Sequence, residues 1–392
     1  MIVIAGAGLV GMTTAVLLAT NGHNVALIDQ RPAPGEVPDA RALVLSPSSV
    51  ECLQILGVWP LVAQRAEPIT DIHVSQQRAF GTVRLSGSML GLEALGWACP
   101  AGFLATTLGN LVNELAGKGA NPPLALRWRT TLLDAVEDAR GVRLTVESDG
   151  ESSSMTSGVL IGADGTDSVV RNIAGLRTIS RDYGQTAIVS HVDVGTPRSH
   201  TAYERFTARG PIAMIPCGGS RYVNVQCVNE SALDEWLAMD DDDYAANLMR
   251  RFGGRLGELV LSGDRRAHSL HAVHTPDVSS GRVAVIGNAA NTLHPNGAQG
   301  LNLGWRDARV LAEMLSAERS SDPSATLASY ADERRADHQR VWRFTDFLAL
   351  GFGTRLPGAP ALRSLMMSMF DAAPPLKRRF GWQATGLAFN RI

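Results

Sequence analysis

The sequence is poor in lysine, in cysteine and in net charge, and each shortage excludes a class of protein. Lys118 and Lys377 are its only lysines, and 36 basic residues face 38 acidic ones, for a formal net charge of −2. A nucleic-acid-binding chain would carry a basic excess, so we expect no nucleic-acid partner. The four cysteines form no CxxC pair and are too few for a disulfide framework: Cys52, Cys99, Cys217 and Cys227. They indicate a reducing compartment, the cytoplasm.

Charge is also missing from two long stretches, and neither is expected to cross a membrane. Residues 1–28 contain no charged side chain, but they lack a basic start and are interrupted by glycines and by the turn Asn21–Asn24. Residues 94–113 are uncharged too, and two glycines, a proline and a third glycine break them. Because a spanning helix needs about 20 unbroken apolar residues, we expect a soluble protein. A length of 392 residues allows two or three domains, or one elaborate α/β unit.

Two further kinds of chemistry find no support. The chain has no GxSxG elbow for acyl transfer. His268, His271 and His274 resemble a metal cluster, but their spacing suits neither one face of a strand nor an i, i+4 helical pair, and no cysteine lies nearby. We therefore predict no metal site.

The apolar pattern predicts an α/β protein. Residues 2–5 and 25–29 have the composition of buried strands, and a helix from about Leu9 to Thr20 separates them, which predicts a parallel sheet. Helical periodicity returns at 46–56, 108–116 and 303–316, and a buried strand is expected at 283–286. Residues 124–161 alternate like an antiparallel meander.

A second, sheet-rich region is expected from about Asp182 to Val273, with strands at 186–194, 212–216 and 222–228. A helical insert at 231–252 carries the acidic run Asp240–Asp243, which we interpret as a solvated helix end. Helices are expected to continue to the C-terminus, with breaks at 357–360 and at Pro374-Pro375.

The first chemically informative pattern is Gly6-Ala7-Gly8-Leu9-Val10-Gly11, between a strand and a helix. Gly6 permits the tight turn, Gly8 lets a pyrophosphate approach the backbone, and Gly11 lets helix and strand pack closely. The helix N-terminus offers free N–H groups to phosphate. Asp29, at the end of the next strand, is placed to accept hydrogen bonds from ribose hydroxyls. This arrangement predicts a dinucleotide but does not separate NAD from FAD.

Two later motifs add to this pattern. Residues 159–165 form a strand followed by an Asp164-Gly165 turn, with Ser168 and Arg171 spaced behind it. Residues 285–290 form a strand followed by Gly-Asn-Ala-Ala, then Leu293-His294-Pro295 and Gln299-Gly300-Leu301-Asn302. Two strand-to-loop junctions far apart in sequence are thus available to converge on one extended cofactor.

With these three motifs in this order, the sequence resembles the single-component FAD-dependent aromatic hydroxylases of the p-hydroxybenzoate hydroxylase superfamily. Within it, the chain is most similar to the ubiquinone-biosynthesis hydroxylases, such as 2-octaprenyl-6-methoxyphenol hydroxylase. That narrower likeness rests on six segments: Ile72–Ser75, Asp182–Ala187, Tyr203–Phe206, Gly210-Pro211, Gly287–Ala290 and Leu293–Pro295. The resemblance spans nearly the whole chain.

The resemblance implies a Rossmann-like FAD-binding domain with an inserted, sheet-rich substrate domain and C-terminal helices. It implies an FAD-binding domain made of residues 1–70, 100–178 and 276–340. Residues 71–99 and 179–275 would form the substrate domain, and 341–392 a C-terminal helical region.

The resemblance also assigns cofactor contacts. Gly6, Gly8, Gly11 and Asp29 would hold the ADP half of FAD, and Arg41 would reach its central region, a surface arginine being the alternative. Asp164 and Gly165 would lie by the pyrophosphate. Asn288 stands where the wider family has an Asp on the ribityl chain. Gly300 would also contact the cofactor, and Leu301 and Asn302 would place backbone N–H groups at the flavin pyrimidine edge, where a helix dipole favours the anionic reduced flavin.

The implied reaction is hydroxylation of a phenol with NAD(P)H and O2, through a flavin hydroperoxide. NAD(P)H would visit transiently, because the chain has a single dinucleotide fingerprint. We expect a polyprenylated substrate, as in ubiquinone biosynthesis, in a pocket lined by Ile212, Met214, Ile215 and Leu301. His294 and Pro295 would lie at the flavin edge, with His294 either an acid/base group or a residue that orders the loop.

One loop departs from the family pattern. The ubiquinone hydroxylases usually have His-Pro-x-x-Gly-Gln-Gly, whereas this chain has His294-Pro295-Asn296-Gly297-Ala298-Gln299-Gly300. The glycine has moved one place earlier, so we expect a position of positive φ to move with it. The change bears on the substrate more than on FAD.

The C-terminal region combines apolar residues (362–370) with the basic run Lys377-Arg378-Arg379. This composition suits contact with an anionic membrane or with a biosynthetic complex, which would make the protein peripheral to the inner membrane. A helix packed on the core is the alternative.

Three other functions also stay open: hydroxylation of a different aromatic, a flavin reductase acting on isoprenoids, and a non-catalytic FAD-binding scaffold.

Overall fold

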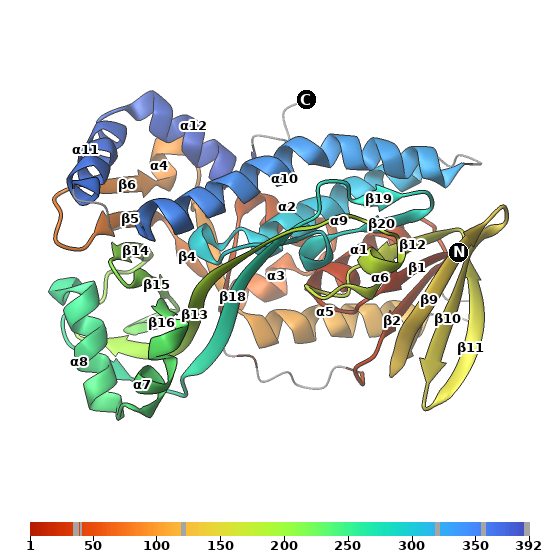
Figure 1. The fold of residues 1–392 in the computed structure, drawn as a ribbon, viewed down its shortest axis with the longest axis horizontal. Coiled ribbons are helices and arrows are strands. Elements are labelled where there is room, and N and C mark those ends of the chain that lie inside the picture. Colours follow the sequence, from red (N-terminus) through yellow and green to blue (C-terminus); the bar gives the residue numbers. More distant parts are fainter. Residues whose placement is uncertain (34–38, 40, 119–122, 318–321, 354–357, 388–392) are drawn as a thin grey trace.

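Two large β-sheets and a group of C-terminal helices form the molecule (Figure 1). The computed structural model describes residues 1–33, 39, 41–118, 123–317, 322–353 and 358–387. The first sheet is mainly parallel, and its strands follow one another in space in the order β19 (Ser279–Ser280), β20 (Val283–Val285), β12 (Val159–Gly162), β1 (Ile2–Ala5), β2 (Val25–Asp29) and β8 (Leu124–Trp128). Its central strand, β1, pairs in parallel with both β2 and β12.

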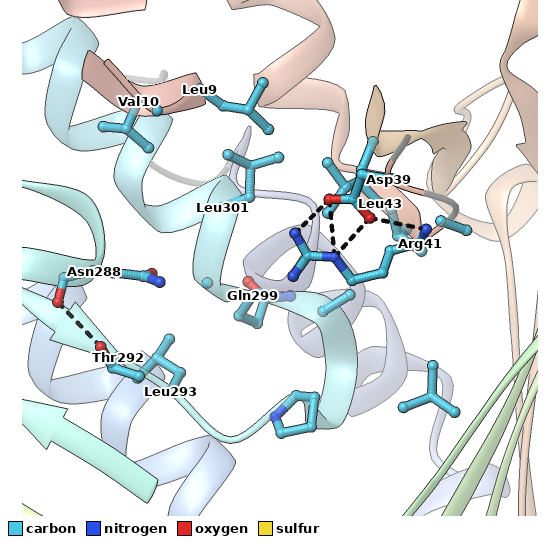
Figure 2. Close-up of a pocket in the computed structure, with 18 of the residues that line it drawn as sticks. Leu9, Val10, Asp39, Arg41, Leu43, Asn288, Thr292, Leu293, Gln299 and Leu301 are labelled. Carbon is cyan, nitrogen blue, oxygen red and sulfur yellow. Dashed lines mark hydrogen bonds and ion pairs between the residues drawn. The ribbon is translucent and has the colours of Figure 1, made fainter. Parts of the chain in front are cut away.

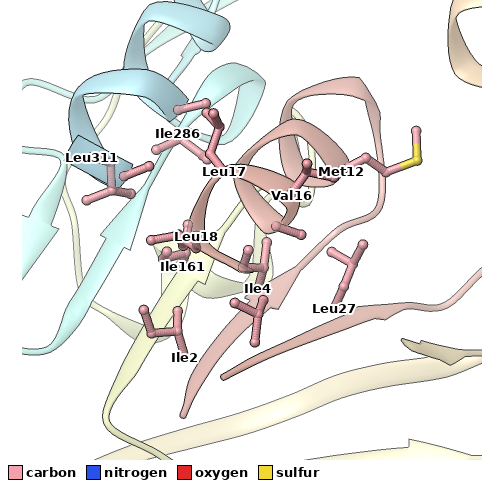
Figure 3. Close-up of a cluster of buried hydrophobic side chains, with 14 of the residues drawn as sticks. Ile2, Ile4, Met12, Val16, Leu17, Leu18, Leu27, Ile161, Ile286 and Leu311 are labelled. Carbon is pink, nitrogen blue, oxygen red and sulfur yellow. The ribbon is translucent and has the colours of Figure 1, made fainter. Parts of the chain in front are cut away.

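The N-terminal strand–helix–strand unit has the predicted bounds. Helix α1 (Leu9–Thr20) connects β1 to β2, and every residue from Gly11 to Ala19 is buried. The helix packs against the sheet and against α9 (Gly300–Ala317) (Figure 3), and its other neighbour is α5 (Ala101–Ala116), so it has no solvated face to carry charge. The uncharged N-terminal stretch is therefore the centre of a globular core. No helix among the described residues is both long enough and apolar enough to span a membrane.

A three-stranded antiparallel sheet extends the same core. It contains β9 (Thr130–Asp138), β10 (Gly141–Ser148) and β11 (Glu151–Ser157), and it is followed after β12 by the short helix α6 (Val169–Ile173). The predicted meander is confirmed here, but two details were wrong. The chain at 124–128 is strand β8, which pairs in parallel with β2, and strand β11 was not expected because its Ser-rich outer face lacks apolar alternation.

The second sheet is mixed and builds the other half of the molecule. Its strand order is β21 (Asn291–Thr292), β18 (Arg266–His274), β13 (Ile179–Val194), β16 (Arg221–Asn229), β15 (Gly210–Pro216), β14 (Thr201–Thr207), β5 (Asp71–Gln76) and β6 (Thr82–Ser86). Strand β17 (Leu259–Leu261) also pairs with β13. The parallel pair β14–β5 brings residues 201–206 beside residues 71–76.

Helices α7 (Leu233–Ala238) and α8 (Asp241–Phe252) cover one face of this sheet and close a second core around Trp236 and Tyr244. Asp240 caps α8 by accepting a hydrogen bond from the backbone N–H of Asp243 at 2.8 Å, which confirms the acidic run as a helix end.

Shorter elements join the two sheets. A small sheet is formed by β3 (Ala42–Leu45), β7 (Gly96–Pro100) and β4 (Glu67–Ile69). Helices α2 (Pro47–Ile55), α3 (Trp59–Val62) and α4 (Gly87–Leu90) lie between these strands in the sequence. Helix α5 begins at Ala101, earlier than the predicted Leu108, because small buried residues such as Gly102 open it and hide its periodicity.

The C-terminal helices are α10 (Pro323–Gly353), α11 (Ala359–Asp371) and α12 (Pro374–Ala384). Helix α10 crosses the molecule beside α9, and α11 packs on β6 (Figure 1). The predicted break at Pro374-Pro375 is confirmed at the start of α12. Of the break predicted at 357–360, Pro357 lies outside the described residues and Pro360 lies inside α11; residues 388–392 also lie outside the described residues.

Candidate active site

A cavity of about 1030 Å³ lies where the two sheets meet. Its lining comes from segments far apart in the sequence: the glycine turn after β1, Arg41 and Leu43 beside β3, the chain around Gly165, residues 292–301, and one face of strands β14 to β16. Figure 2 shows the part of the lining around Leu9, Arg41 and Leu301. The three sequence motifs therefore converge on one space large enough for a dinucleotide and a second ligand.

The glycine turn contains two glycines that the protein itself requires. Gly6 has φ +102°, and a Cβ there would lie 2.3 Å from the carbonyl oxygen of Ala163. A Cβ on Gly11 would lie 1.9 Å from the carbonyl oxygen of Gly6. Both would collide with backbone, so these positions bring the first and second motifs together.

Gly8 is different, because a Cβ at this position would meet no described atom within 4 Å. Gly8 lines the cavity at the N-terminus of α1, where the first backbone N–H groups have no partner within the helix. A bare backbone facing an open space at a helix N-terminus fits a phosphate group. The site therefore fits the dinucleotide that the sequence implies.

Asp29 ends β2 next to this turn and is buried. Its carboxylate accepts hydrogen bonds from the backbone N–H of Ala7 at 2.7 Å and from the guanidinium of Arg31 at 2.7 and 2.9 Å. Burial alone would raise the pKa of Asp29, but the hydrogen bonds from Arg31 and Ala7 outweigh it and lower the pKa. The carboxylate is therefore ionised and oriented beside the glycine turn.

Arg41 lines the cavity and is held by an ion pair. Its Nη2 lies 2.6 Å from Oδ2 of Asp39, and its Nε lies 2.9 Å from Oδ1 of the same carboxylate (Figure 2). The hydrogen bonds that Arg41 donates to Asp39 raise the pKa of Arg41 despite its partial burial. Arg41 is thus a fixed cation at the cavity wall, available to a phosphate or a polar cofactor group.

In the second motif, Gly165 lines the cavity and the Asp164 side chain does not. Gly165, with φ +90°, lines the cavity. The Asp164 carboxylate points to α6 instead, where it accepts from Ser168 Oγ at 2.5 Å and from the backbone N–H of Val169 at 2.8 Å. The Asp164 side chain therefore caps α6, and a position of Asp164 and Gly165 by the pyrophosphate stays a prediction that would depend on their backbone.

The third motif is tied to the second by contacts that the sequence did not reveal. Thr292 Oγ1 lies 2.9 Å from Thr166 Oγ1, and Arg171 donates to the carbonyl oxygens of Thr166 at 2.8 Å and Ala289 at 3.2 Å. Asn288 lines the cavity between these contacts. The only sequence signal for this link was the spacing of Arg171 behind the Asp-Gly turn.

Helix α9 presents its N-terminus to the cavity. It begins at Gly300, not Leu303, so Gly300, Leu301 and Asn302 carry backbone N–H groups of its first turn. Gly300 and Leu301 line the cavity. The Asn302 side chain is turned away and buried, where its Oδ1 accepts from Ser46 N at 2.8 Å and its Nδ2 donates to Val44 O at 2.9 Å. These hydrogen bonds join α9 to the β3–α2 segment, a role of Asn302 that the sequence does not indicate.

The segment 294–300, called here the 294–300 loop, leads into this helix. His294 and Pro295 both line the cavity, and His294 is buried with its ring edge-on to Tyr183 at 4.9 Å. Burial lowers the pKa of His294 to about 4, so its imidazole is neutral at physiological pH. Its Nδ1 accepts from the backbone N–H of Asn296 at 3.4 Å, and its buried Nε2 has no partner among the described residues. A neutral imidazole with one free nitrogen is able to form a hydrogen bond with a polar ligand group, but it is not protonated at neutral pH and so does not act as a general acid there.

The far wall of the cavity is the second sheet. Ile215 lines the cavity together with Pro211 and Ala213, which precede it at every second position of β15 and so share its face of the sheet. Ile212 and Met214 point to the opposite face and are fully buried in the core beneath α7 and α8. The expectation that these two residues line the pocket is wrong, because successive side chains of a strand alternate between faces.

Comparison with known proteins agrees with this geometry. Residues 1–345 match the family model described as "FAD binding domain". The chain is 32% identical to the ubiquinone hydroxylase UbiL of Rhodospirillum rubrum, over 98% of this chain and 89% of that protein. It is 29% identical to the 3-demethoxyubiquinol 3-hydroxylase of Escherichia coli, over 98% of each chain.

Solved structures place the fold in the same group. The p-nitrophenol 4-monooxygenase of Pseudomonas putida superposes with a TM-score of 0.79 at 18% identity, covering 100% of this chain and 98% of that one. The predicted fold class and the predicted cofactor, FAD, are thereby confirmed, and NAD(P)H is the co-substrate typical of such enzymes. The chain belongs to the FAD-binding-domain family of FAD-dependent monooxygenases.

Proposed function

We propose that this enzyme hydroxylates the ring of a polyprenylated phenol in ubiquinone biosynthesis, with NAD(P)H and O2 as co-substrates. The observation that carries the proposal is the single cavity shared by the dinucleotide motifs and the apolar sheet wall. The substrate class is inferred from two relatives, one a ubiquinone hydroxylase and the other a 3-demethoxyubiquinol 3-hydroxylase.

For the cofactor, we assign Gly6, Gly8 and Gly11 to the pyrophosphate turn and Asp29 to the adenosine ribose. Arg41, Asn288 and the backbone beside Asp164 and Gly165 would contact the middle of the molecule. When bound, FAD accepts electrons from NAD(P)H and delivers one oxygen atom of O2 to the phenol ring. Residues of this chain hold, orient and shield the reactants.

At the reacting end, we assign the first turn of α9 to the flavin edge. The N–H groups of Gly300, Leu301 and Asn302 and the helix dipole would stabilise negative charge there. His294 and Pro295 would border the substrate, with the neutral His294 ring as a hydrogen-bonding group. Apolar residues of the lining, among them Ala213, Ile215 and Leu301, would keep water away from the reacting atoms once the ligands are bound.

The proposal is tested with purified, FAD-loaded enzyme and two phenols that share one ring, one with a long prenyl tail and one without. We expect NAD(P)H oxidation to be coupled to hydroxylated product, and kcat/KM to be higher for the tailed phenol by at least about ten-fold, because several buried CH₂ groups each contribute about 0.8 kcal/mol. Mass spectrometry of quinone intermediates in deficient cells with and without the chain identifies the ring position.

The alternatives predict different results. Equal turnover of short and tailed phenols would contradict the lipid substrate and favour another aromatic. Reduction of an isoprenoid double bond without stoichiometric O2 consumption would identify a reductase. Protein that binds FAD but fails to oxidise NAD(P)H in the presence of any phenol would identify a scaffold.

We also propose that the enzyme works in the cytoplasm at the surface of the inner membrane, through α11 and α12. Four large apolar side chains of α11 are exposed at i, i+3, i+4 and i+7 spacing: Leu362, Leu365, Met366 and Met369. The exposed residues Arg378 and Arg379 lie on α12, which packs against α11. An apolar stripe beside basic residues suits an anionic lipid surface.

A further inference from the structure

The cavity wall formed by the second sheet contains one carboxylate. Glu204, on β14, lines the cavity together with Ala202 two residues before it. Across the sheet, Glu204 is registered with Ala213 of β15, and Ala213 with Val225 of β16. The carboxylate is therefore surrounded on its own face of the sheet by small or apolar side chains.

The Glu204 carboxylate has no hydrogen bond or ion pair with any described residue. Its neighbour Arg205 points to the opposite face, where it donates to Ser75 Oγ at 3.1 Å and to the carbonyl oxygen of Arg251 at 3.3 Å. The Cys227 thiol on β16 lies on the same wall, and its pKa is raised by burial and by Glu204. The other ionisable groups of the lining are Arg31, the paired Asp39 and Arg41, His294 and Tyr203.

Glu204 is partly buried, and its carboxylate lies at the cavity surface with no protein partner among the described residues. A carboxylate partly removed from water in an otherwise apolar wall is stabilised by a ligand that donates a hydrogen bond to it. Burial raises the pKa of Glu204 to about 7, so the ionised and neutral forms are both populated near neutral pH. Such a group suits proton exchange with a bound ligand.

We infer that Glu204 binds the hydroxyl of the phenol substrate and accepts its proton. The O–H bond of the phenol breaks, its proton moves to a carboxylate oxygen of Glu204, and the electron pair stays on the phenolate oxygen. The neutral carboxyl then donates a hydrogen bond back to that oxygen. The phenolate directs electron density to the ring carbons beside it, which prepares one of them to accept an electrophilic oxygen atom. This inference rests on the proposed function, because it requires a phenol in the cavity.

The first test measures binding alone, on oxidised FAD-loaded enzyme. Isothermal titration compares 4-methylphenol with its methyl ether, which has no proton to donate. We expect the wild type to bind the phenol about ten-fold more tightly or better, since a hydrogen bond to a charged group is worth about 1.5–3 kcal/mol. Glu204→Met should bring the ratio of the two Kd values close to one. An unchanged ratio in this variant would overturn the inference.

The second test measures turnover and its pH dependence in Glu204→Gln, which keeps the shape of the side chain but cannot accept the proton. We expect kcat to fall by about 100-fold with little change in KM, and the wild-type loss of rate below about pH 7 to disappear. Glu230→Gln, an exposed carboxylate in the turn after β16, is the matched control and should keep the wild-type profile.

The two tests separate this inference from the proposed function. If Glu204→Gln keeps both rate and pH profile while tailed phenols are hydroxylated, the role of Glu204 is wrong and the proposed function stands. If no phenol is turned over but binding still depends on Glu204, the substrate proposal fails and the phenol site stands. FAD content and the thermal unfolding midpoint of each variant verify that it is folded.

Discussion

Ala298 occupies a left-handed backbone conformation in the 294–300 loop. Its φ is +51°, and the preceding Gly297 has φ +73°. The shifted Gly297 thus has the positive φ that the sequence predicts, and Ala298, where the family pattern has its glycine, adopts a positive φ as well. An alanine pays a steric penalty in this region that a glycine avoids.

Ala298→Gly should for this reason stabilise the enzyme. We expect the free energy of unfolding to rise by about 0.5–1 kcal/mol, since relief of about 1–2 kcal/mol of strain is partly offset by the greater freedom of glycine in the unfolded chain. Urea unfolding measures the change. Ala308→Gly, within α9, is the control and should destabilise by about 1 kcal/mol or more. A destabilised Ala298→Gly would contradict the argument.

Gly8 permits a separate residue-scale prediction, because nothing in the protein fills the space where its side chain would be. Gly8→Ala should leave the unfolding midpoint of the FAD-free protein unchanged and weaken FAD binding by about ten-fold or more, since the methyl group would intrude on the phosphates. FAD fluorescence titration measures the affinity. Gly11→Ala is the contrast, with loss of folding stability expected from its 1.9 Å contact. Equal FAD affinity in Gly8→Ala would remove Gly8 from the site.

At the scale of whole elements, α9 and α10 are joined by a buried network of charges. Asp307 Oδ1 lies 2.8 Å from Arg334 Nε and 2.7 Å from His338 Nε2, and Asp337 bonds Arg334 at 2.6 Å and Arg306 at 2.8 Å. Burial would raise the pKa of Asp307, but the charges of His338 and Arg334 outweigh it and keep the carboxylate ionised. The network fixes the helix whose N-terminus faces the cavity.

Arg334→Met should therefore destabilise the enzyme by about 3–5 kcal/mol, because it removes the cation that two buried carboxylates share. The neighbouring Arg335 forms an exposed i, i+3 pair with Asp332 at 2.7 Å on the same helix. Arg335→Met is the control and should cost less than about 1 kcal/mol. Chemical denaturation of both variants checks the prediction, and similar losses would disprove it.

The elements that sequence predicted well are those with one dominant signal. Strands β1 and β2 and helix α1 are buried on every side, so their apolar runs and glycine turn define them without reference to the rest of the chain. Strand β11 was missed because its exposed serines carry no apolar alternation.

The site was predicted in its motifs but not in its side-chain directions. Gly6, Gly8 and Leu301 follow from local pattern, whereas Asp164 caps a helix and Met214 faces away from the cavity. Those directions depend on sheet register and on partners distant in sequence, which no local spacing encodes.

At the scale of the whole molecule, the exposed stripe on α11 makes membrane contact testable. The enzyme should sediment with vesicles that contain anionic lipid and not with purely zwitterionic ones, and high salt should weaken binding. Replacing Leu365 and Met369 together by serine should reduce binding by about ten-fold or more, since each loses a large exposed apolar side chain.

The matched control replaces Leu133 and Val136, two exposed apolar residues of β9. Vesicle binding should be unchanged in this double serine variant, and both variants should keep wild-type turnover of a short, soluble phenol. Equal binding by the two double variants would show that α11 is not the contact.

The strand order of the first sheet has a consequence for biosynthesis of the enzyme on the ribosome. Strand β1 is made first, yet its neighbour β12 and the next strand, β20, follow about 160 and 280 residues later. The strand β5 likewise has to wait for β14 before it gains its parallel partner. Such distant pairings slow folding, so the nascent chain exposes unpaired apolar strands for most of translation, and we expect its dependence on chaperones to end only after β20 has emerged.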